Sequence, residues 1–185
     1  MSVSKPPAPD DERDLGPEAD PESVARKILL DQLTGRARTR AELADKLAKR
    51  NVPGDIAARL LDRFEEVGLI DDAAFAAEWI EQRQAGRGLA RRALALELKR
   101  KGVDDDTARA ALDTIEQDDE VEAAREMVRR KLRSVAGLDN ERATRRLVGM
   151  LARKGHSPGT AYRVVREELA AAGDEGRDVF DVMPD

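Results

Sequence analysis

Residues 94–103 read LALELKRKGV, and close copies of this stretch occur at 43–52 (LADKLAKRNV) and 147–156 (LVGMLARKGH). The copies share a Leu-x-x-x-Leu pair followed by basic residues and a turn, and they are offset by 51 and then 53 residues. A fixed period of this kind is typical of stacked supersecondary units, each of which buries its apolar face on its neighbours. The pattern predicts a helical array with a long free surface, which favours binding to an extended partner over catalysis.

The composition also indicates helices. Charged residues make up 38% of the 185-residue chain and aromatic residues only 3%, while alanine and leucine dominate the apolar positions. Such a mixture with helical spacing is typical of long solvated helices, and β-branched and aromatic residues do not alternate over any useful run. The predicted fold is all-α, an elongated tandem array of three three-helix repeats with disordered acidic tails.

Cysteine content and hydropathy limit the compartment. The chain contains no cysteine, which excludes disulfides and thiolate metal sites. The N-terminal segment carries acidic residues and prolines where a signal peptide needs a basic patch and an apolar run. No stretch approaches the ~18 consecutive apolar residues of a membrane span. We therefore expect a cytoplasmic protein with no membrane segment.

The formal net charge of −5 is unevenly distributed along the chain. Residues 1–21 and 171–185 contribute −4 each, so residues 22–170 carry +3. A charge asymmetry of this kind matters more for binding than the total does, because a partner meets the local field of the folded part. The acidic total therefore does not exclude an anionic partner.

Capping residues and glycines divide the chain into segments. Residues 1–19 contain four prolines and many charges, which predicts disorder, and Asp20-Pro21 has the residue types of a helix start. Other predicted helix starts are the capping box Thr39-x-x-Glu42, Asp71, Asp104 and Ser157-Pro158. Predicted helix ends lie at Gly35, Gly68, Gly102, Gly155 and Gly173. These marks predict nine helices, grouped into repeats at 22–70, 71–118 and 119–172. An acidic, proline-rich leader (1–21) precedes the repeats and an acidic C-terminal tail (173–185) follows them.

Residues that could serve catalysis have simpler structural explanations. His156 is the sole histidine, and it takes the turn position that Val52 and Val103 hold in the other copies, which predicts a partly buried structural residue. A single histidine without cysteine cannot form the common zinc sites. Acidic runs such as 104–106 and 118–120 lie at predicted helix starts, where capping and the helix dipole account for them.

The glycine-rich segment Gly86-Arg87-Gly88 lacks the frame of a phosphate-binding loop and has no preceding strand. We therefore expect no nucleotide, no cofactor, no metal site and no catalytic residues. The protein is predicted not to be an enzyme.

Basic residues are the remaining candidates for a functional surface. Residues 83–101 carry a charge of +6, with Glu97 as the one acid, and residues 125–133 form a second cluster in which Glu126 is the one acid. An array of this kind attracts phosphate or an acidic protein surface, although a solvated helix face is the simpler alternative. The predicted partner- or DNA-binding residues are Arg83, Arg87, Arg91, Arg92, Lys99, Arg100, Lys101, Arg129, Arg130, Lys131 and Arg133.

Base-specific reading of nucleic acid is not expected. Few aromatic residues are available to stack on bases, and Trp79 and Phe75 are spaced as core residues of one helix. Any contact with DNA should therefore be electrostatic and weak.

Residues 68–103, GLIDDAAFAAEWIEQRQAGRGLARRALALELKRKGV, resemble the centre of the RecX family, the bacterial regulators of the RecA recombinase. The resemblance is carried by Leu69-Ile70-Asp71-Asp72 leading to Phe75, by the aromatic Trp79, by an Arg/Gly-rich link and by a helix ending Leu98-x-x-Lys101-Gly102. It covers residues 22–170, including RARTRAELADKLAKR near the start and LARKGHSPGTAYRVVREEL near the end.

The resemblance implies a non-enzymatic modulator with tandem three-helix repeats. Members of the family bind RecA, chiefly its filament on single-stranded DNA, and restrain its ATPase, strand-exchange and co-protease activities in recombination and the SOS response. They are thought to lie in the helical groove of the filament and are also reported to touch DNA. In this chain His156 replaces an aromatic residue often found after the Lys-Gly turn, and both acidic tails are additional.

Two other hypotheses stay open at this point. A helix-turn-helix pair within one repeat could bind duplex DNA with sequence preference. A helical scaffold for an unrelated protein is the third possibility, because a repeat architecture does not determine its ligand.

Overall fold

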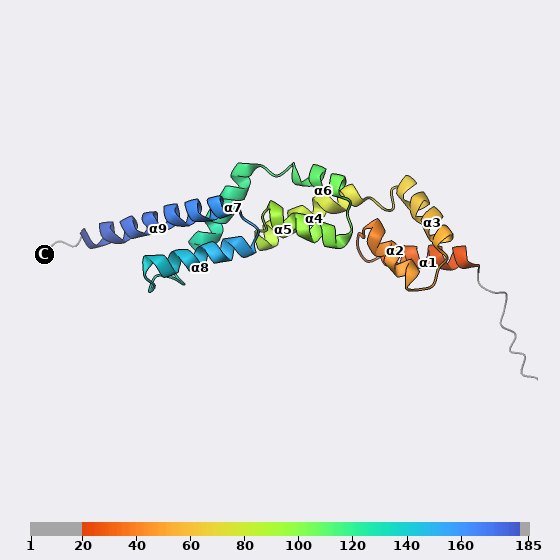
Figure 1. The fold of residues 1–185 in the computed structure, drawn as a ribbon, viewed down its shortest axis with the longest axis horizontal. Helices are drawn as coiled ribbons and strands as arrows, with labels where there is room; N and C mark the ends of the chain where they lie inside the picture. Colours follow the sequence, from red (N-terminus) through yellow and green to blue (C-terminus); the bar gives the residue numbers. More distant parts are fainter. Residues whose placement is uncertain (1–19, 182–185) are drawn as a thin grey trace, which may run out of the picture.

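Nine helices and no strand occupy residues 20–181, the part of the chain that the computed structural model describes, with side chains described as far as Gly173 (Figure 1). The helices are α1 (Pro21–Leu33), α2 (Arg40–Ala48), α3 (Gly54–Glu66), α4 (Asp72–Arg87), α5 (Arg91–Lys101), α6 (Asp105–Leu112), α7 (Gln117–Leu132), α8 (Asn140–Arg153) and α9 (Pro158–Asp181). Helices α1–α3, α4–α6 and α7–α9 form three consecutive units. Residues 1–19 of the predicted leader lie outside the described residues.

Each unit has an apolar core of its own. The leucine pairs of the repeated stretch form the centre of these cores and are almost completely buried: Leu43 and Leu47, Leu94 and Leu98, Leu147 and Leu151. Burying one such side chain contributes about 1.5–3 kcal/mol. The periodic pattern read from the sequence is therefore the pattern of residues that hold each unit together.

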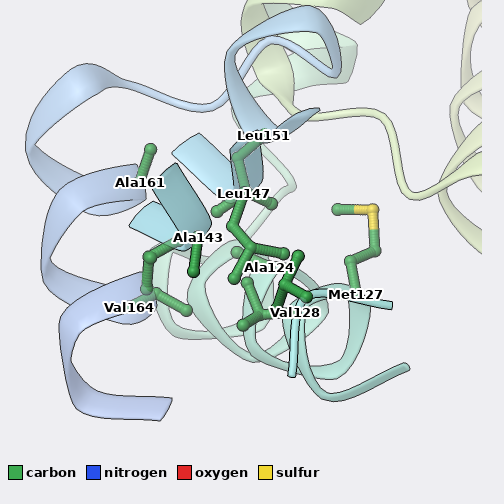
Figure 2. Packing of buried hydrophobic residues seen from close by; sticks show 10 residues of the cluster. Ala124, Met127, Val128, Ala143, Leu147, Leu151, Ala161 and Val164 are labelled. Carbon is green, nitrogen blue, oxygen red and sulfur yellow. The ribbon is translucent and has the colours of Figure 1, made fainter. Parts of the chain in front are cut away.

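The third unit shows how three helices share one core (Figure 2). Met127 and Val128 come from α7, Leu147 from α8, and Val164 from α9, and all four are buried. Alanines at positions 124, 143 and 161 let the helices approach one another closely. The core therefore needs no aromatic residue, in agreement with the low aromatic content of the chain.

The units follow one another along the long axis of the molecule, with α1–α3 near one end and α9 near the other (Figure 1). Separate cores and an elongated shape are the properties of a tandem array. The predicted all-α array of three-helix repeats is confirmed.

Capping side chains begin most of the helices where the sequence predicted. The carboxylates of Asp20, Asp71 and Asp104 accept hydrogen bonds from backbone N–H groups in the first turns of α1, α4 and α6. The Ser157 hydroxyl accepts a 3.1 Å bond from the Thr160 amide at the start of α9. These contacts satisfy donors that an uncapped helix leaves free.

Only half of the predicted capping box forms. The Thr39 hydroxyl oxygen accepts a 3.1 Å bond from the Glu42 amide, but the Glu42 carboxylate accepts from Lys101 instead of returning to Thr39. The long-range ion pair takes the carboxylate that the local motif would use.

Four of the five predicted helix ends are found: α1 ends at Leu33, just before Gly35, and three other helices end just before glycines with a left-handed backbone. Gly68, Gly102 and Gly155 have φ values of 72°, 78° and 92° in the turns after α3, α5 and α8. In contrast, α9 continues through Gly173 to Asp181, so the predicted helix end at Gly173 is wrong. A glycine inside a helix costs only about 1 kcal/mol, and no proline follows it until position 184 to stop the helix.

At each of the two joints between units, an equivalent carbonyl oxygen accepts a hydrogen bond from the N-cap residue of the preceding unit's middle helix. In the first joint, the hydroxyl of Thr39, the N-cap of α2, donates a 2.6 Å bond to the Lys101 carbonyl oxygen. In the second joint, the amide of Ala90, the N-cap of α5, donates a 2.9 Å bond to the Lys154 carbonyl oxygen. The donors are 51 residues apart and the acceptors 53 residues apart, which are the offsets of the sequence repeat. The starts of α2 and α5 therefore each contact the Lys-Gly turn of the next unit.

Candidate partner-binding surface

The predicted basic residues divide into two groups in the structure. Five of them make ion pairs or hydrogen bonds among the described residues: Arg83, Arg91, Lys101, Arg129 and Arg130, which is itself exposed and pairs with Glu126 at 4.0 Å. The other six are exposed: Arg87, Arg92, Lys99, Arg100, Lys131 and Arg133. The exposed group is the one that can meet a partner without breaking internal contacts.

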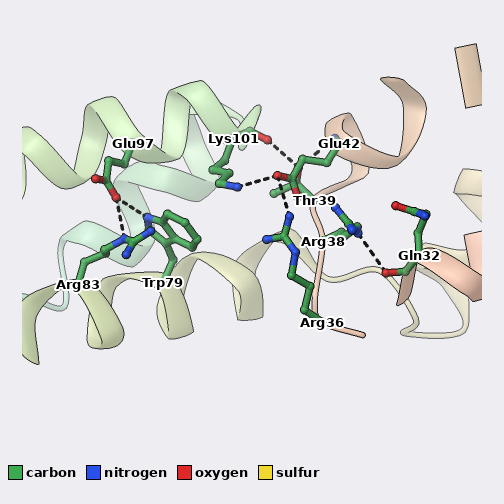
Figure 3. Close-up of polar contacts among 9 residues, drawn as sticks. All are labelled: Gln32, Arg36, Arg38, Thr39, Glu42, Trp79, Arg83, Glu97 and Lys101. Carbon is green, nitrogen blue, oxygen red and sulfur yellow. Dashed lines mark hydrogen bonds and ion pairs between the residues drawn. The ribbon is translucent and has the colours of Figure 1, made fainter. Parts of the chain in front are cut away.

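Arg83 belongs to a cluster around Trp79 (Figure 3). The Trp79 ring stacks on Phe75 with centroids 5.6 Å apart, and the Arg83 guanidinium lies 4.0 Å from the Trp79 ring centroid. The Glu97 carboxylate accepts from Trp79 Nε1 at 2.9 Å and from Arg83 Nε at 3.0 Å. Stacking and cation–π contacts of this geometry stabilise the middle unit. The prediction that Trp79 and Phe75 are core residues is confirmed.

Lys101 connects this cluster to the first unit. Its ammonium lies 4.8 Å from the Trp79 ring centroid and donates a 2.7 Å bond to Glu42 (Figure 3). Partial burial alone would raise the pKa of the Glu42 carboxyl, but the hydrogen bond and charge of Lys101, with Arg36 and Arg38 nearby, hold that pKa below its usual value. Lys101 is therefore part of the first joint.

Arg91 has a counterpart in the first unit. It donates to Asp113 at 3.2 Å and to the Ile115 carbonyl oxygen at 2.8 Å, so it connects the start of α5 to the segment after α6. Arg40, 51 residues earlier, donates to Asp62 at 2.6 Å, and Asp62 lies 51 residues before Asp113. The repeated ion pair gives Arg91 a structural role.

Arg129 lies on the surface of the third unit, where it pairs with carboxylates of α7 and α9. It donates a 2.8 Å bond from Nε to the buried Glu168 carboxylate of α9, and a second carboxylate, Glu122, lies 3.6 Å away. The hydrogen bond to Glu168 raises the pKa of Arg129. This side chain holds α7 to α9 and is not free to bind a partner.

Three of the exposed cations meet at the junction of the second and third units. Arg87 at the end of α4 and Arg130 and Lys131 on α7 line one groove of about 480 Å³, together with Lys154 at the end of α8. We call this the junction groove. The two basic clusters, 43 residues apart at Arg87 and Arg130, therefore converge in space.

The junction groove is lined by glycines and apolar side chains as well as by charged residues. Gly86 and Gly88 lie on one side, Met127 and Met150 form an apolar part, and Glu126 is the one acid among its lining residues. Gly88 has a φ of 58° and a Cβ there would lie 2.9 Å from the Met127 sulfur. A chain of phosphates or carboxylates could approach this surface closely.

Sequence reasoning missed Lys154 as a site residue. It occurs in the repeated Lys-Gly turn, and the joint contact of its carbonyl group places its side chain at the groove. The equivalent Lys101 side chain is bound to Glu42, so the sequence pattern gave no sign that the two lysines differ.

A second groove of about 570 Å³ runs between α5 and α6 in the middle unit. One face of α5 contributes Arg91, Arg92, Ala95, Leu96 and Lys99, and one face of α6 contributes Asp105, Ala108, Arg109, Leu112 and Asp113. We call this the α5–α6 groove. It contains two of the exposed predicted cations, Arg92 and Lys99. Arg100 and Arg133 line neither of these two grooves.

His156 is buried in the turn between α8 and α9, as its alignment with Val52 and Val103 predicted. Its amide bonds to the Leu151 carbonyl at 3.2 Å, and Val103 makes the equivalent bond to Leu98. Within the described part of the chain neither ring nitrogen meets the geometry of a hydrogen bond, and Nδ1 lies 3.8 Å from a Glu120 carboxylate oxygen. Burial lowers the pKa of His156, although the charge of Glu120 opposes this change.

The described residues contain no group of three or more side chains that could hold a metal ion. Among the helices of the described range, none combines the length and apolar character that a membrane crossing requires.

Three consecutive segments match three domain models of one family. Residues 25–64 match "RecX, first three-helix domain", residues 71–112 match "RecX, second three-helix domain", and residues 118–165 match "RecX, third three-helix domain". The chain belongs to the RecX family. The resemblance of residues 68–103 to RecX proteins is therefore confirmed.

Curated RecX relatives are similar in sequence to this chain over most of their length. "Regulatory protein RecX" of Thermobifida fusca (strain YX) is 53% identical over 163 residues, covering 86% of this chain and 88% of the relative. "Regulatory protein RecX" of Mycobacterium bovis (strain BCG / Pasteur 1173P2) is 45% identical over 181 residues, covering 96% and 99%. RecX proteins are thus named as regulators and not as enzymes.

A solved RecX structure has the same fold. The crystal structure of RecX from Lactobacillus salivarius matches with a TM-score of 0.76 over 83% of this chain and 99% of that chain. Sequence identity is 22%, so this likeness bears on the three-unit architecture alone.

Proposed function

We propose that this RecX-family protein regulates the RecA recombinase in the cytoplasm by binding RecA and its filament on single-stranded DNA. Binding restrains ATP hydrolysis, strand exchange and co-protease activity in recombination and the SOS response. The junction groove is the observation that carries the proposal, because Arg87, Arg130, Lys131 and Lys154 converge there on an elongated array. An elongated protein with a cationic groove suits a filament that exposes acidic side chains and phosphates.

The test is the DNA-dependent ATPase rate of the cognate RecA on single-stranded DNA, titrated with the protein. The paired substitutions Arg87→Glu and Lys131→Glu reverse two exposed charges of the junction groove without touching an internal ion pair among those found. We expect wild-type protein to inhibit ATP hydrolysis and the double variant to need about tenfold more protein for the same inhibition. Arg91 is unsuitable for this test because its reversal would break the bond to Asp113.

Lys46→Glu with Lys49→Glu is the matched control, since both lysines are exposed in the first unit and the change in net charge is the same. The control variant should inhibit like wild type, and wild-type inhibition should weaken as salt rises because the contacts are electrostatic. Equal inhibition by both double variants would contradict the role of the junction groove. No inhibition by wild type at any ratio would contradict RecA regulation.

Direct DNA binding is the second candidate, favoured by the same four cations. It predicts that Arg87→Glu with Lys131→Glu weakens binding to bare DNA as much as binding to the filament. A helix-turn-helix regulator would in addition prefer one duplex sequence over random DNA in competition.

A further inference from the structure

The α5–α6 groove has an apolar floor in which Leu96 is exposed to solvent, whereas Ala108 and Leu112 belong to the buried core of the middle unit. Leu96 is the most exposed large apolar side chain of the middle unit, with 57% of its surface accessible, and it lies beside Ala95, Ala108 and Leu112. Apolar surface gathered in a groove between polar walls is typical of a site that receives another molecule.

Leu96 is specific to the middle unit. At the offsets of 51 and 53 residues, the same position is Asp45 in the first unit and Gly149 in the third. An exposed Asp45 shows that the position tolerates a charge, so the fold does not require leucine there. The side chain at position 96 is therefore free to serve binding.

The shape of the groove fits a helix. Its α5 residues 91, 92, 95, 96 and 99 and its α6 residues 105, 108, 109, 112 and 113 are each spaced along one helix face. Two helix faces that diverge around an apolar floor form the kind of groove in which an amphipathic helix lays its apolar side.

The charges of the walls indicate which helix is preferred. Arg92 and Lys99 are exposed on the α5 wall, two helical turns apart. On the α6 wall, Asp113 is paired with Arg91, and Arg109 is paired with Asp106 outside the groove. The cations of the α5 wall thus remain available for carboxylates, while Asp105 is the remaining acid of the α6 wall.

We infer that the α5–α6 groove binds an amphipathic helical segment of a protein partner, with leucine-type side chains on one face and carboxylates beside them. Its apolar face covers Leu96 and Leu112, and its carboxylates pair with Arg92 and Lys99. The identity of the partner as RecA rests on the proposed function. The groove is separate from the junction groove, so one chain can hold a protein segment and a polyanion at the same time.

The absence of cysteine allows a site-specific test on the full chain. Leu96→Cys provides the one thiol, which carries an environment-sensitive fluorophore, and Asp45→Cys carries the same label at the equivalent position of the first unit. The first probe is a synthetic amphipathic peptide of about 20 residues with a leucine stripe and glutamates. A scrambled peptide and a peptide with lysine for glutamate are its controls. The second probe is the RecA filament on single-stranded DNA, beside the DNA alone.

We expect the acidic peptide to shift the emission of the label at position 96 to the blue, with the position 45 label and both control peptides giving no change. In unlabelled protein, Leu96→Asp should weaken peptide binding at least about tenfold, while Asp45→Leu does not. Circular dichroism should show unchanged helix content, because residue 96 is exposed. The filament should shift the label as the peptide does, and bare DNA should not.

Two results separate this proposal from the proposed function. Filament binding that is weakened by Arg87→Glu with Lys131→Glu, without any response of the label to peptide or filament, would overturn the groove proposal and leave RecA regulation standing. Peptide binding without any filament binding would support the groove and overturn RecA as the partner.

A shift that depends on protein concentration alone would assign the groove to a second copy. A shift on removal of residues 1–19 would assign it to the acidic leader, and either result would overturn the proposal.

Discussion

The backbone amide of Ala90 donates a 2.9 Å hydrogen bond to the carbonyl oxygen of Lys154, which places the start of α5 against the turn after α8. Gly155 follows Lys154 in that turn, and a Cβ atom at Gly155 would lie 2.6 Å from the Ala93 nitrogen and 2.7 Å from the Ala93 Cβ. The joint therefore requires glycine at position 155 for two reasons: the backbone there is left-handed, and α5 lies too close to leave room for a side chain.

Gly155→Ala should destabilise the protein by about 2–5 kcal/mol, since a left-handed alanine costs about 1–2 kcal/mol and overpacking about 1–3 kcal/mol. Asn51 is the matched control, because it occupies the same turn of the first unit with a φ of 56° and already carries a side chain. Asn51→Ala should lose only the stability that a left-handed alanine costs, about 1–2 kcal/mol. Urea unfolding measures both, and equal losses in the two variants would show that the joint does not constrain Gly155.

Arg83 and Arg87 lie one helical turn apart but should respond differently to substitution. Arg83→Gln loses the ion pair with Glu97 and the cation–π contact with Trp79, so we expect a loss of about 1–2 kcal/mol in the free energy of unfolding. Arg87→Gln should change stability by less than about 0.5 kcal/mol, because the side chain is exposed. Tryptophan fluorescence reports directly on Trp79, the sole tryptophan. Similar stability of the two variants would remove the structural role of Arg83.

Glu42→Gln should make the protein less dependent on pH in the acid range. The pKa of Glu42 is lower in the folded state than its usual value of 4.5, so the bond to Lys101 stabilises the fold above that pH and is lost as pH falls through the folded pKa. At pH 7 we expect a loss of about 1–2 kcal/mol in the variant, and this difference should shrink toward pH 3. Thermal unfolding across this range measures it. A difference that stays constant with pH would contradict the ionic contact.

Wild-type protein should become less stable on mild acidification, and the His156→Val variant should not. Burial lowers the pKa of His156 in the folded state below its usual 6.5, so the unfolded chain binds the proton more readily. Wild-type stability should therefore fall as pH drops through 6.5, whereas a variant with the valine of the other two turns should not show this fall. Urea unfolding at pH 7.5 and 5.5 compares them. If both proteins lose the same stability, His156 is not the group that titrates.

Much of the fold was predictable because it depends on local chemistry. The leucine pairs, the capping residues Asp20 and Asp104 and the turn glycines act within a few residues of their own position, and these predictions were confirmed. Gly173 failed as a helix end because a helix can also continue through a glycine, at a cost of about 1 kcal/mol.

The candidate site was less predictable because it depends on how the units are placed. A run of basic residues does not reveal that Arg83 covers an indole ring or that Lys101 reaches a carboxylate 59 residues away. Nor does it reveal that Arg87 and Lys131 meet in one groove. These relationships arise at joints between units, where residues far apart in sequence become neighbours.

The joint also bears on how one copy of the protein can meet another. At one end, Asn51 presents a side chain where Gly102 and Gly155 present none. At the other end, Ala143 is the position that matches Ala90 at the 53-residue offset, but its amide already donates to Asp139 inside α8. Arg146 likewise stands where Ala93 is found in the joint. The residues at these two positions therefore do not reproduce the contact that holds the three units together. Under the proposed function, copies placed along a filament would meet through contacts other than this joint.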